Sequence, residues 1–364
     1  MRTPAIRRVA VVGTGLIGGS IALALRARRP EVEVVGFDRD GRQSAEAVVR
    51  GAIDRAAETA RAAVAEADLV VLAVPTSAVR ATLDEIAPAL AAGALVTDVA
   101  SVKGPVVEAA GEVLPDDVTF VGGHPMAGSE RGGMAHADAL LFENAVYVLT
   151  PTGGDPPDPR AVWLAEAVGA RPVLMAADRH DAVVAAVSHL PQLAAVALVQ
   201  LAAEVGDDAL ALAAGGFRDM TRIASSPFGM WGGVLDANRD AVLRTLDAYA
   251  AGLGRLRAAV EAGDHGALAD AFRQSAETRG AIPSHSKGFL APLAEVTLWA
   301  EDRVGFLAAV TGALAEAEVN VKDIELLRVR EGEGGAFRLA FADGPTADRA
   351  LDVLRGLGLR AERR

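Results

Sequence analysis

The first part of the chain alternates short apolar runs with helical stretches. Runs dominated by Val, Leu, Ala and Ile indicate strands buried on both faces, and stretches such as 21–26 and 78–90 between them have helical character. Strands that alternate with helices predict a parallel, doubly wound α/β sheet of the Rossmann type, which we assign to residues 1–176. The predicted strands are 9–12, 32–37, 68–74, 94–97, 118–121, 145–150 and 171–175, with a further helix at 162–168.

From residue 177 the pattern becomes helical, and we predict an all-α domain over 177–284. Pro191 removes a helical hydrogen bond to the carbonyl of Val187, so we expect the first helix to kink there. The predicted helices are 178–204, 207–214, 217–224, 229–262 and 264–281.

A linker at 285–293 precedes a small α+β domain over 294–364. Its order is strand, helix, strand, hairpin, strand and helix, with room for a final short strand, which is typical of a ferredoxin-like domain. The predicted segments are 296–300, 306–317, 319–328, 332–335, 337–341 and 346–357, with Asn320 at the start of the second strand.

A glycine loop follows the first strand and predicts a dinucleotide site. Gly13 allows the turn, Gly15 lets the backbone approach a pyrophosphate, and Gly18 lets the helix pack on the strand. Asp38 ends the second strand, and its carboxylate favours NAD over NADP, although Arg39 follows directly and leaves NADP use open. The predicted cofactor-binding residues are Gly13, Thr14, Gly15, Leu16, Ile17, Gly18, Asp38 and Ser101.

Candidate catalytic residues follow two of the later strands. His124 lies in the glycine-rich stretch 122–133, where we expect irregular backbone at a strand end, and Ser101 and Lys103 are expected at the same sheet edge. A neutral imidazole there can accept a proton near neutral pH. The alternatives are that His124 only holds the loop, that Ser101 caps the next helix, and that Lys103 is solvated in its first turn.

The helical domain adds His189, beside Pro191, and Arg222. Arg222 lies between apolar neighbours and is expected to point inward, where it needs a carboxylate from a ligand or from Asp219. His189 could instead be a core histidine with its hydrogen bonds satisfied.

The amino-acid composition limits the kinds of binding partner and of metal or redox site that this protein can have. The net charge of −12 argues against nucleic acid and anionic membranes, and the lack of cysteine excludes disulfides, thiolate metal sites and cysteine nucleophiles; no metal site is predicted. A strand at Val9 leaves no room for a signal peptide, which predicts a cytoplasmic protein. The run 182–203 has no charged residue but contains polar ones, so we expect a helix buried in protein that packs on a second copy in a homodimer.

Four motifs together resemble the prephenate dehydrogenases over about residues 5–285. The last segment, with Glu301-Asp-Arg-Val-Gly-Phe-Leu307 and Val319-Asn-Val321, is similar to ACT-type regulatory domains. The four motifs are Gly122-Gly-His-Pro-Met-Ala-Gly-Ser-Glu-Arg-Gly132, Asp98-Val-Ala-Ser-Val-Lys103, Ser188-His-Leu-Pro191 and Phe217-Arg-Asp-Met-Thr-Arg-Ile-Ala224.

The resemblance implies NAD-dependent oxidative decarboxylation of prephenate to 4-hydroxyphenylpyruvate, a step of tyrosine synthesis. It implies that His124 accepts a hydrogen bond from the ring hydroxyl with support from Ser101, and that Arg222 binds a carboxylate. His189 and Trp231 would line the substrate pocket, although Trp231 could equally be a core residue. Tyrosine would be an effector of the last domain through Asp302, Gly305 and Asn320, where Val304 replaces the usual Pro of the turn.

Three other functions remain open from the sequence. An arogenate dehydrogenase would use the same scaffold on a substrate with an amino group. A β-hydroxyacid dehydrogenase has a catalytic Lys on its helical part, whereas this chain has no Lys between Lys103 and Lys287. A non-catalytic NAD or amino-acid sensor would have no need of a His, Ser and Arg set.

Overall fold

The computed structural model describes residues 6–128, 131–152, 157–281, 293–300, 303–330 and 334–363. The chain forms two compact units, residues 1–268 and 269–364.

The first unit contains an eight-stranded sheet with the order β3-β2-β1-β4-β5-β6-β7-β8. Its first six strands are parallel, β7 runs antiparallel to β6, and β8 is parallel to β7. The predicted doubly wound sheet is therefore present, with one antiparallel pairing that the sequence pattern did not predict. The strands are β1 (Arg8–Val12), β2 (Glu33–Phe37), β3 (Arg55–Ala56), β4 (Leu69–Leu72), β5 (Leu95–Asp98), β6 (Thr119–Pro125), β7 (Val146–Pro151) and β8 (Arg171–Leu174).

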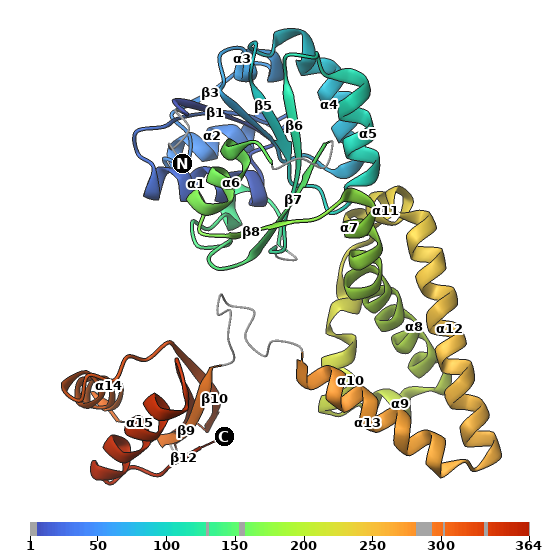
Figure 1. The fold of residues 1–364 in the computed structure, drawn as a ribbon, viewed down its shortest axis with the longest axis vertical. Coiled ribbons are helices and arrows are strands. Elements are labelled where there is room, and N and C mark those ends of the chain that lie inside the picture. The colour runs from blue at the N-terminus through green and yellow to red at the C-terminus, as the bar shows by residue number, and fades with distance from the viewer. Residues whose placement is uncertain are drawn as a thin grey trace. The chain divides into compact units, whose positions relative to one another are not determined.

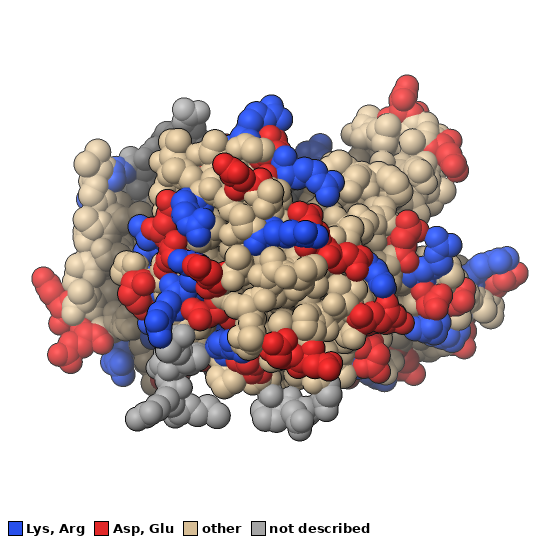
Figure 2. Space-filling view, turned by 90° about the horizontal axis from the view of Figure 1, so that it is seen from above, with Lys and Arg blue, Asp and Glu red and all other residues tan. Residues whose placement is uncertain are grey.

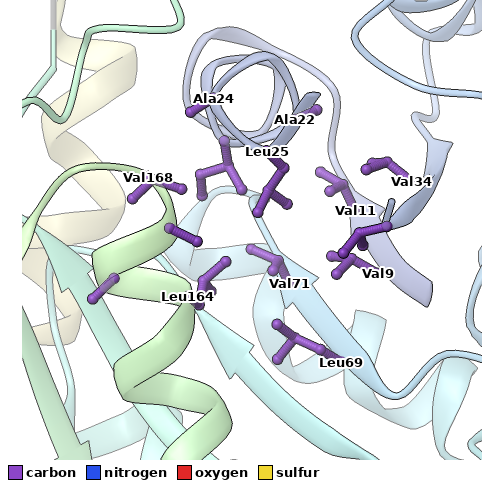
Figure 3. Packing of buried hydrophobic residues seen from close by; sticks show 14 of the residues in the cluster. Val9, Val11, Ala22, Ala24, Leu25, Val34, Leu69, Val71, Leu164 and Val168 are labelled. Carbon is purple, nitrogen blue, oxygen red and sulfur yellow. The ribbon is translucent and has the colours of Figure 1, made fainter. Parts of the chain in front are cut away.

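Helices cover both faces of this sheet (Figure 1). Val9 and Val11 of β1 pack towards α1 and α6, as Figure 3 shows for part of this core, whereas Ala10 and Val12 pack on the opposite face. Successive strand residues point to opposite faces, so burial on both sides explains the uniformly apolar strands. The helices are α1 (Leu16–Arg28), α2 (Gly41–Val49), α3 (Ala60–Val64), α4 (Val79–Ile86), α5 (Gly104–Val113) and α6 (Pro159–Ala167), with short turns η1 (Thr76–Ala78), η2 (Ala87–Ala89) and η3 (Met134–His136).

The helical segment departs from the prediction at three points. A π-helical turn, η4 (Ala185–His189), precedes Pro191, so a local widening of the helix accommodates the missing hydrogen bond. The predicted helix 229–262 is broken at Asn238, and the predicted helix 217–224 ends at Thr221. The helices are α7 (Ala177–Val184), α8 (Leu190–Val205), α9 (Asp207–Ala211), α10 (Gly215–Thr221), η5 (Arg222–Ser225), α11 (Phe228–Ala237), α12 (Arg239–Ala262) and α13 (His265–Ala281).

The segment Ala177–Val205 is long and apolar enough to cross a membrane by length and composition alone. Within one chain only 28% of its most apolar window is buried. Large apolar side chains are also exposed on the neighbouring α12, including Leu243, Leu253 and Val260. The single chain therefore leaves a broad apolar surface on its helical segment.

Residues 294–363 of the second unit form a four-stranded antiparallel sheet of order β10-β11-β9-β12 with two helices, which confirms the ferredoxin-like arrangement and its short last strand. Val296 and Leu298 of β9 form its core with Phe306. Asn320 lies in an exposed loop before β10, not at a strand start as predicted, and Asp302 lies outside the described residues. Its elements are β9 (Ala294–Ala300), α14 (Phe306–Glu316), β10 (Asp323–Arg330), β11 (Gly334–Phe341), α15 (Gly344–Gly356) and β12 (Ala361–Arg363).

Acidic and basic side chains lie interspersed over the face of the molecule shown in Figure 2, with broad uncharged areas between them. Mixed charge of this kind differs from the continuous basic surface that binds a phosphate backbone.

Candidate active site

His124 lies within β6 and not on irregular backbone as predicted, because β7 pairs with β6 and extends it to Pro125. The two preceding glycines serve close packing. A Cβ on Gly123 would lie 2.5 Å from the carbonyl oxygen of Asp98, and one on Gly122 would lie 2.2 Å from Thr150 Oγ1. The glycines therefore let neighbouring strands approach and fix the position of the imidazole.

A buried ion pair holds the residue before His124. The Lys103 ammonium binds the Asp98 carboxylate and donates to the carbonyl oxygen of Gly123 at 2.6 Å, and Asp98 accepts from the Gly123 N–H at 3.0 Å. Burial lowers the pKa of Lys103, and the negative charge of Asp98 opposes that shift. The alternative of a solvated Lys103 was wrong, since its side chain is fully buried.

A hydrogen-bonded chain runs from His124 to Asp181. His124 Nδ1 lies 2.8 Å from His180 Nε2, and His180 Nδ1 lies 2.8 Å from Asp181 Oδ1. A carboxylate only accepts, so a neutral His180 carries its proton on Nδ1 and accepts from His124 at Nε2. His124 then carries its proton on Nδ1, and within the described residues no hydrogen-bond partner occupies the lone pair of Nε2.

Asp181 also caps α5. Its two carboxylate oxygens accept from the backbone N–H groups of Lys103 and Gly104, each at 2.8 Å. These are the first groups of the helix, whose N-cap is Lys103. The alternative in which Ser101 caps this helix was therefore wrong, and Ser101 lines the pocket described below.

The imidazole of His124 is held uncharged. Burial lowers its pKa well below the ordinary value of 6.5, and the positive charge of Lys103 lowers it further. The side chain is 9% exposed, so a small part reaches solvent or a ligand. A neutral histidine with one free lone pair can accept a hydrogen bond or a proton.

All five predicted catalytic and substrate-binding residues line one pocket of about 640 Å³. Ser101 and His124 come from the sheet edge, and His189, Arg222 and Trp231 come from the helical segment. The pocket also includes Pro125, Met126, Ala127, Gly128, Val184, Ser188, Ile223, Ser225, Ser226, Met230 and Val234.

Arg222 differs from its predicted state. It is exposed rather than buried; α10 ends at Thr221, and Arg222 begins the turn η5. Over the described residues, no ion pair joins it to Asp219 or to another carboxylate. Gln192 donates to the neighbouring carbonyl of Ile223 at 3.0 Å and so fixes the turn from which Arg222 lines the pocket.

The glycine loop has the shape that a dinucleotide requires. Gly13 has a φ of +98°, and a Cβ there would lie 2.3 Å from the carbonyl oxygen of Ala73, whereas the space beside Gly15 is open within 4 Å. No side chain caps the described N-terminus of α1, so its first N–H groups can bind phosphate. Gly18 lies against Gly13, where a Cβ would meet the Gly13 carbonyl oxygen at 1.9 Å.

The predicted ribose carboxylate stands beside this loop. Asp38 accepts from the backbone N–H groups of Thr14 at 2.8 Å and Asp40 at 2.9 Å, which hold it at the end of β2. It lines a cavity of about 400 Å³ together with Gly13 and Arg39. These residues fit a nicotinamide dinucleotide, with Leu16 and Ile17 at the start of α1 and Thr14 in the loop before it.

In the second unit, Gly305 precedes α14 with a φ of +83°, a conformation that favours glycine. Val304 beside it is fully exposed, and Asn320 is exposed as well.

Sequence reasoning placed Lys103 at the sheet edge but missed its pairing with Asp98, and it missed His180, Asp181 and Asn238. A lysine five residues after a strand-end carboxylate was a visible signal for the Asp98–Lys103 pair. The other three gave no local signal, because the pocket residues that they contact lie far from them in the chain.

A nucleotide-binding sheet beside a pocket with a neutral histidine, a serine and an arginine defines an NAD-dependent dehydrogenase. Family models describe the same parts: the prephenate dehydrogenase nucleotide-binding domain matches residues 21–173, the prephenate dehydrogenase dimerization domain matches 176–274, and the ACT domain matches 294–359. The chain belongs to the prephenate dehydrogenase family.

Relatives agree with this assignment. Prephenate dehydrogenase of Bacillus subtilis is 35% identical over 94% of each chain. The structure of prephenate dehydrogenase from Aquifex aeolicus with hydroxyphenyl propionate and NAD+ covers 77% of this chain and 100% of its own, at 29% identity and a TM-score of 0.71. Synechocystis arogenate dehydrogenase covers 75% of this chain and 99% of its own, at 32% identity and a TM-score of 0.68.

Proposed function

We propose that this protein catalyses the NAD+-dependent oxidative decarboxylation of prephenate to 4-hydroxyphenylpyruvate. The observation that carries the proposal is the shared pocket that His124, with its free Nε2, lines together with Ser101, His189 and Arg222. The ring hydroxyl of prephenate needs a hydrogen-bond acceptor, and its carboxylates need donors. These four pocket residues supply both.

The reaction divides among these groups. Arg222 pairs with a substrate carboxylate and orients the ring. His124 Nε2 accepts the hydrogen bond of the ring hydroxyl, and Ser101 supports that hydroxyl while charge develops at the carbon that bears it. NAD+ held by the glycine loop and Asp38 would supply the hydride acceptor for that carbon.

Loss of carbon dioxide completes the change. The bond between the quaternary ring carbon and its carboxylate breaks, and its electron pair enters the ring, which becomes aromatic. The phenol keeps its proton overall, so a proton drawn towards His124 returns to the oxygen. The protein therefore needs to hold and polarise the substrate, and no separate acid is required.

Charge in the pocket supports prephenate over arogenate. Among the described residues that line the pocket, none is Asp or Glu, whereas Arg222 is cationic. The ammonium group of arogenate would find no carboxylate among them, and the keto group of prephenate needs none.

We propose that the enzyme is a homodimer in the cytoplasm. The match to a dimerization domain and the exposed apolar side chains of α8 and α12 support the dimer. Leu253→Glu on α12 should shift the chain from dimer to monomer in sedimentation analysis. Val49→Glu is the matched control, because Val49 is 85% exposed on α2.

We also propose feedback inhibition by tyrosine through the ACT-type unit, supported by the family match over 294–359. A chain truncated after residue 292 should keep its dehydrogenase activity and lose inhibition. Inhibition that persists in this variant would place tyrosine in the dehydrogenase pocket instead.

The proposed activity is tested by NADH formation with prephenate and arogenate, each with NAD+ and NADP+ and with and without tyrosine. His124→Asn should lower kcat about 10²- to 10⁴-fold with little change in substrate binding. Arg222→Ala should mainly raise KM. Near-normal turnover in the first variant, or an unchanged KM in the second, would reject the assigned role.

A further inference from the structure

His189 is the one pocket histidine outside the chain from His124 to Asp181, and its ring is held from two sides. It ends the π-helical turn η4 and is buried. Its ring meets Trp231 edge-on at 6.0 Å between centroids. Its Nδ1 lies 3.3 Å from Asn238 Nδ2.

The second bond of Asn238 settles the direction of this contact. Asn238 Nδ2 lies 2.9 Å from the backbone carbonyl oxygen of Asp181, and the residue is buried at the break between α11 and α12. A carbonyl oxygen only accepts, so the atom that faces it must be the amide nitrogen, since a flipped amide would bring two oxygens together.

The amide nitrogen carries two hydrogens and accepts nothing. One hydrogen is used on Asp181, and the other points at His189 Nδ1, which must therefore accept. Burial lowers the pKa of His189, so the ring is neutral and carries its single proton on Nε2.

We propose that Asn238 is a positioning residue that makes His189 a hydrogen-bond donor to the substrate through Nε2. The same residue, Asp181, then sets opposite roles for the two pocket histidines. Its carboxylate acts through His180 and leaves His124 Nε2 as an acceptor, and its carbonyl acts through Asn238 and leaves His189 Nε2 as a donor.

These opposite roles match one kind of ligand, with a hydroxyl at the end that meets His124 and an oxygen acceptor, such as a carboxylate or keto group, at the end that meets His189. The inference deepens the proposed function and rests on it for the identity of the ligand. The proton position itself is independent of any substrate.

The first test is therefore made without substrate. Long-range proton–nitrogen correlation spectra of the full-length chain with isotope-labelled histidine report which ring nitrogen carries the proton. The His189 signals are assigned by their loss in His189→Asn. A proton on Nε2 is the expected result, and a proton on Nδ1 overturns the proposal whether or not the enzyme uses prephenate.

The second test reverses the donor. In Asn238→Asp a carboxyl oxygen replaces the amide nitrogen that donates to His189 Nδ1, so the proton of His189 should move to Nδ1. KM for prephenate should then rise about 10- to 100-fold, the usual worth of a hydrogen bond to a charged group, with kcat nearly kept.

Asn238→Leu is the matched control, because it removes the same bond to Asp181 without offering an acceptor to His189. It should raise KM less than Asn238→Asp does and leave the Nε2 proton in place. Equal effects of both variants, or an unmoved proton in Asn238→Asp, would reduce Asn238 to a structural residue. If the variants do not fold, the wild-type spectrum alone decides.

Discussion

Asp181→Leu offers the sharpest test of the chain that leads to His124. The native carboxylate accepts three hydrogen bonds at 2.8 Å, from His180 Nδ1 and from the N–H groups of Lys103 and Gly104. Oδ1 accepts from both His180 and Lys103, so an amide oxygen at that position would keep the chain intact. A leucine side chain has a similar shape and removes the acceptor.

The loss of this acceptor then passes along the chain. The proton of His180 is no longer held on Nδ1 and can move to Nε2, so His124 accepts at Nδ1 and carries its proton on Nε2, where a lone pair is needed. Loss of a general base lowers turnover about 10²- to 10⁴-fold. That range corresponds to about 3 to 5 kcal/mol of activation free energy, at about 1.4 kcal/mol for each factor of ten. The weaker cap on α5 costs about 1 kcal/mol of folding stability.

The assay measures kcat and KM from NADH formation, the Kd of NAD+ by titration, and thermal unfolding. We expect kcat to fall, the Kd of NAD+ to stay unchanged, and the chain to remain folded. Asp178→Leu is the control, because Asp178 lies exposed on the same helix, α7, and the change removes the same charge. A folded Asp181→Leu enzyme with kcat within about threefold of wild type would refute the proposed proton arrangement.

Three further predictions concern protonation, the buried ion pair and the cofactor. Burial lowers the pKa of both His124 and His189, so kcat/KM should stay constant as the pH falls to 6.5 and decline only below that value. A decline centred above pH 6.5 would contradict a neutral buried base. The unfolded chain binds these protons first, so the free energy of unfolding should also fall as pH drops below about 6.5. Lys103→Met should lower the free energy of unfolding, measured in urea, by about 3 kcal/mol, because it leaves the Asp98 charge buried without its cation. Adding Asp98→Asn should recover part of that loss. A Lys103→Met variant as stable as wild type would show that the ion pair is dispensable. Asp38→Asn should improve kcat/KM for NADP+ relative to NAD+ by roughly 10- to 100-fold, since it removes repulsion of a 2′-phosphate beside Arg39, and an unchanged ratio would assign the preference to other residues.

Much of the fold could be predicted because its signals are local. The glycine loop between β1 and α1, the apolar strands and the turn glycines each act on neighbouring residues, and their spacing is visible in the sequence. Errors arose where a distant partner decides the outcome. The pairing with β7 extends β6 through His124, and the break at Asn238 divides a helical pattern that has no Pro or Gly at that position.

The sequence by itself determined three things: a nucleotide-binding sheet, a helical segment after it and a small α+β domain at the end, together with the residue types of the pocket. Only the tertiary structure decided which nitrogens of the histidines are free. His124 meets His180 across 56 positions of the chain, and Asp181 reaches Lys103 across 78 positions. The physical reason is that a proton position depends on hydrogen-bond partners and burial, and both arise only when the sheet and the helices pack together.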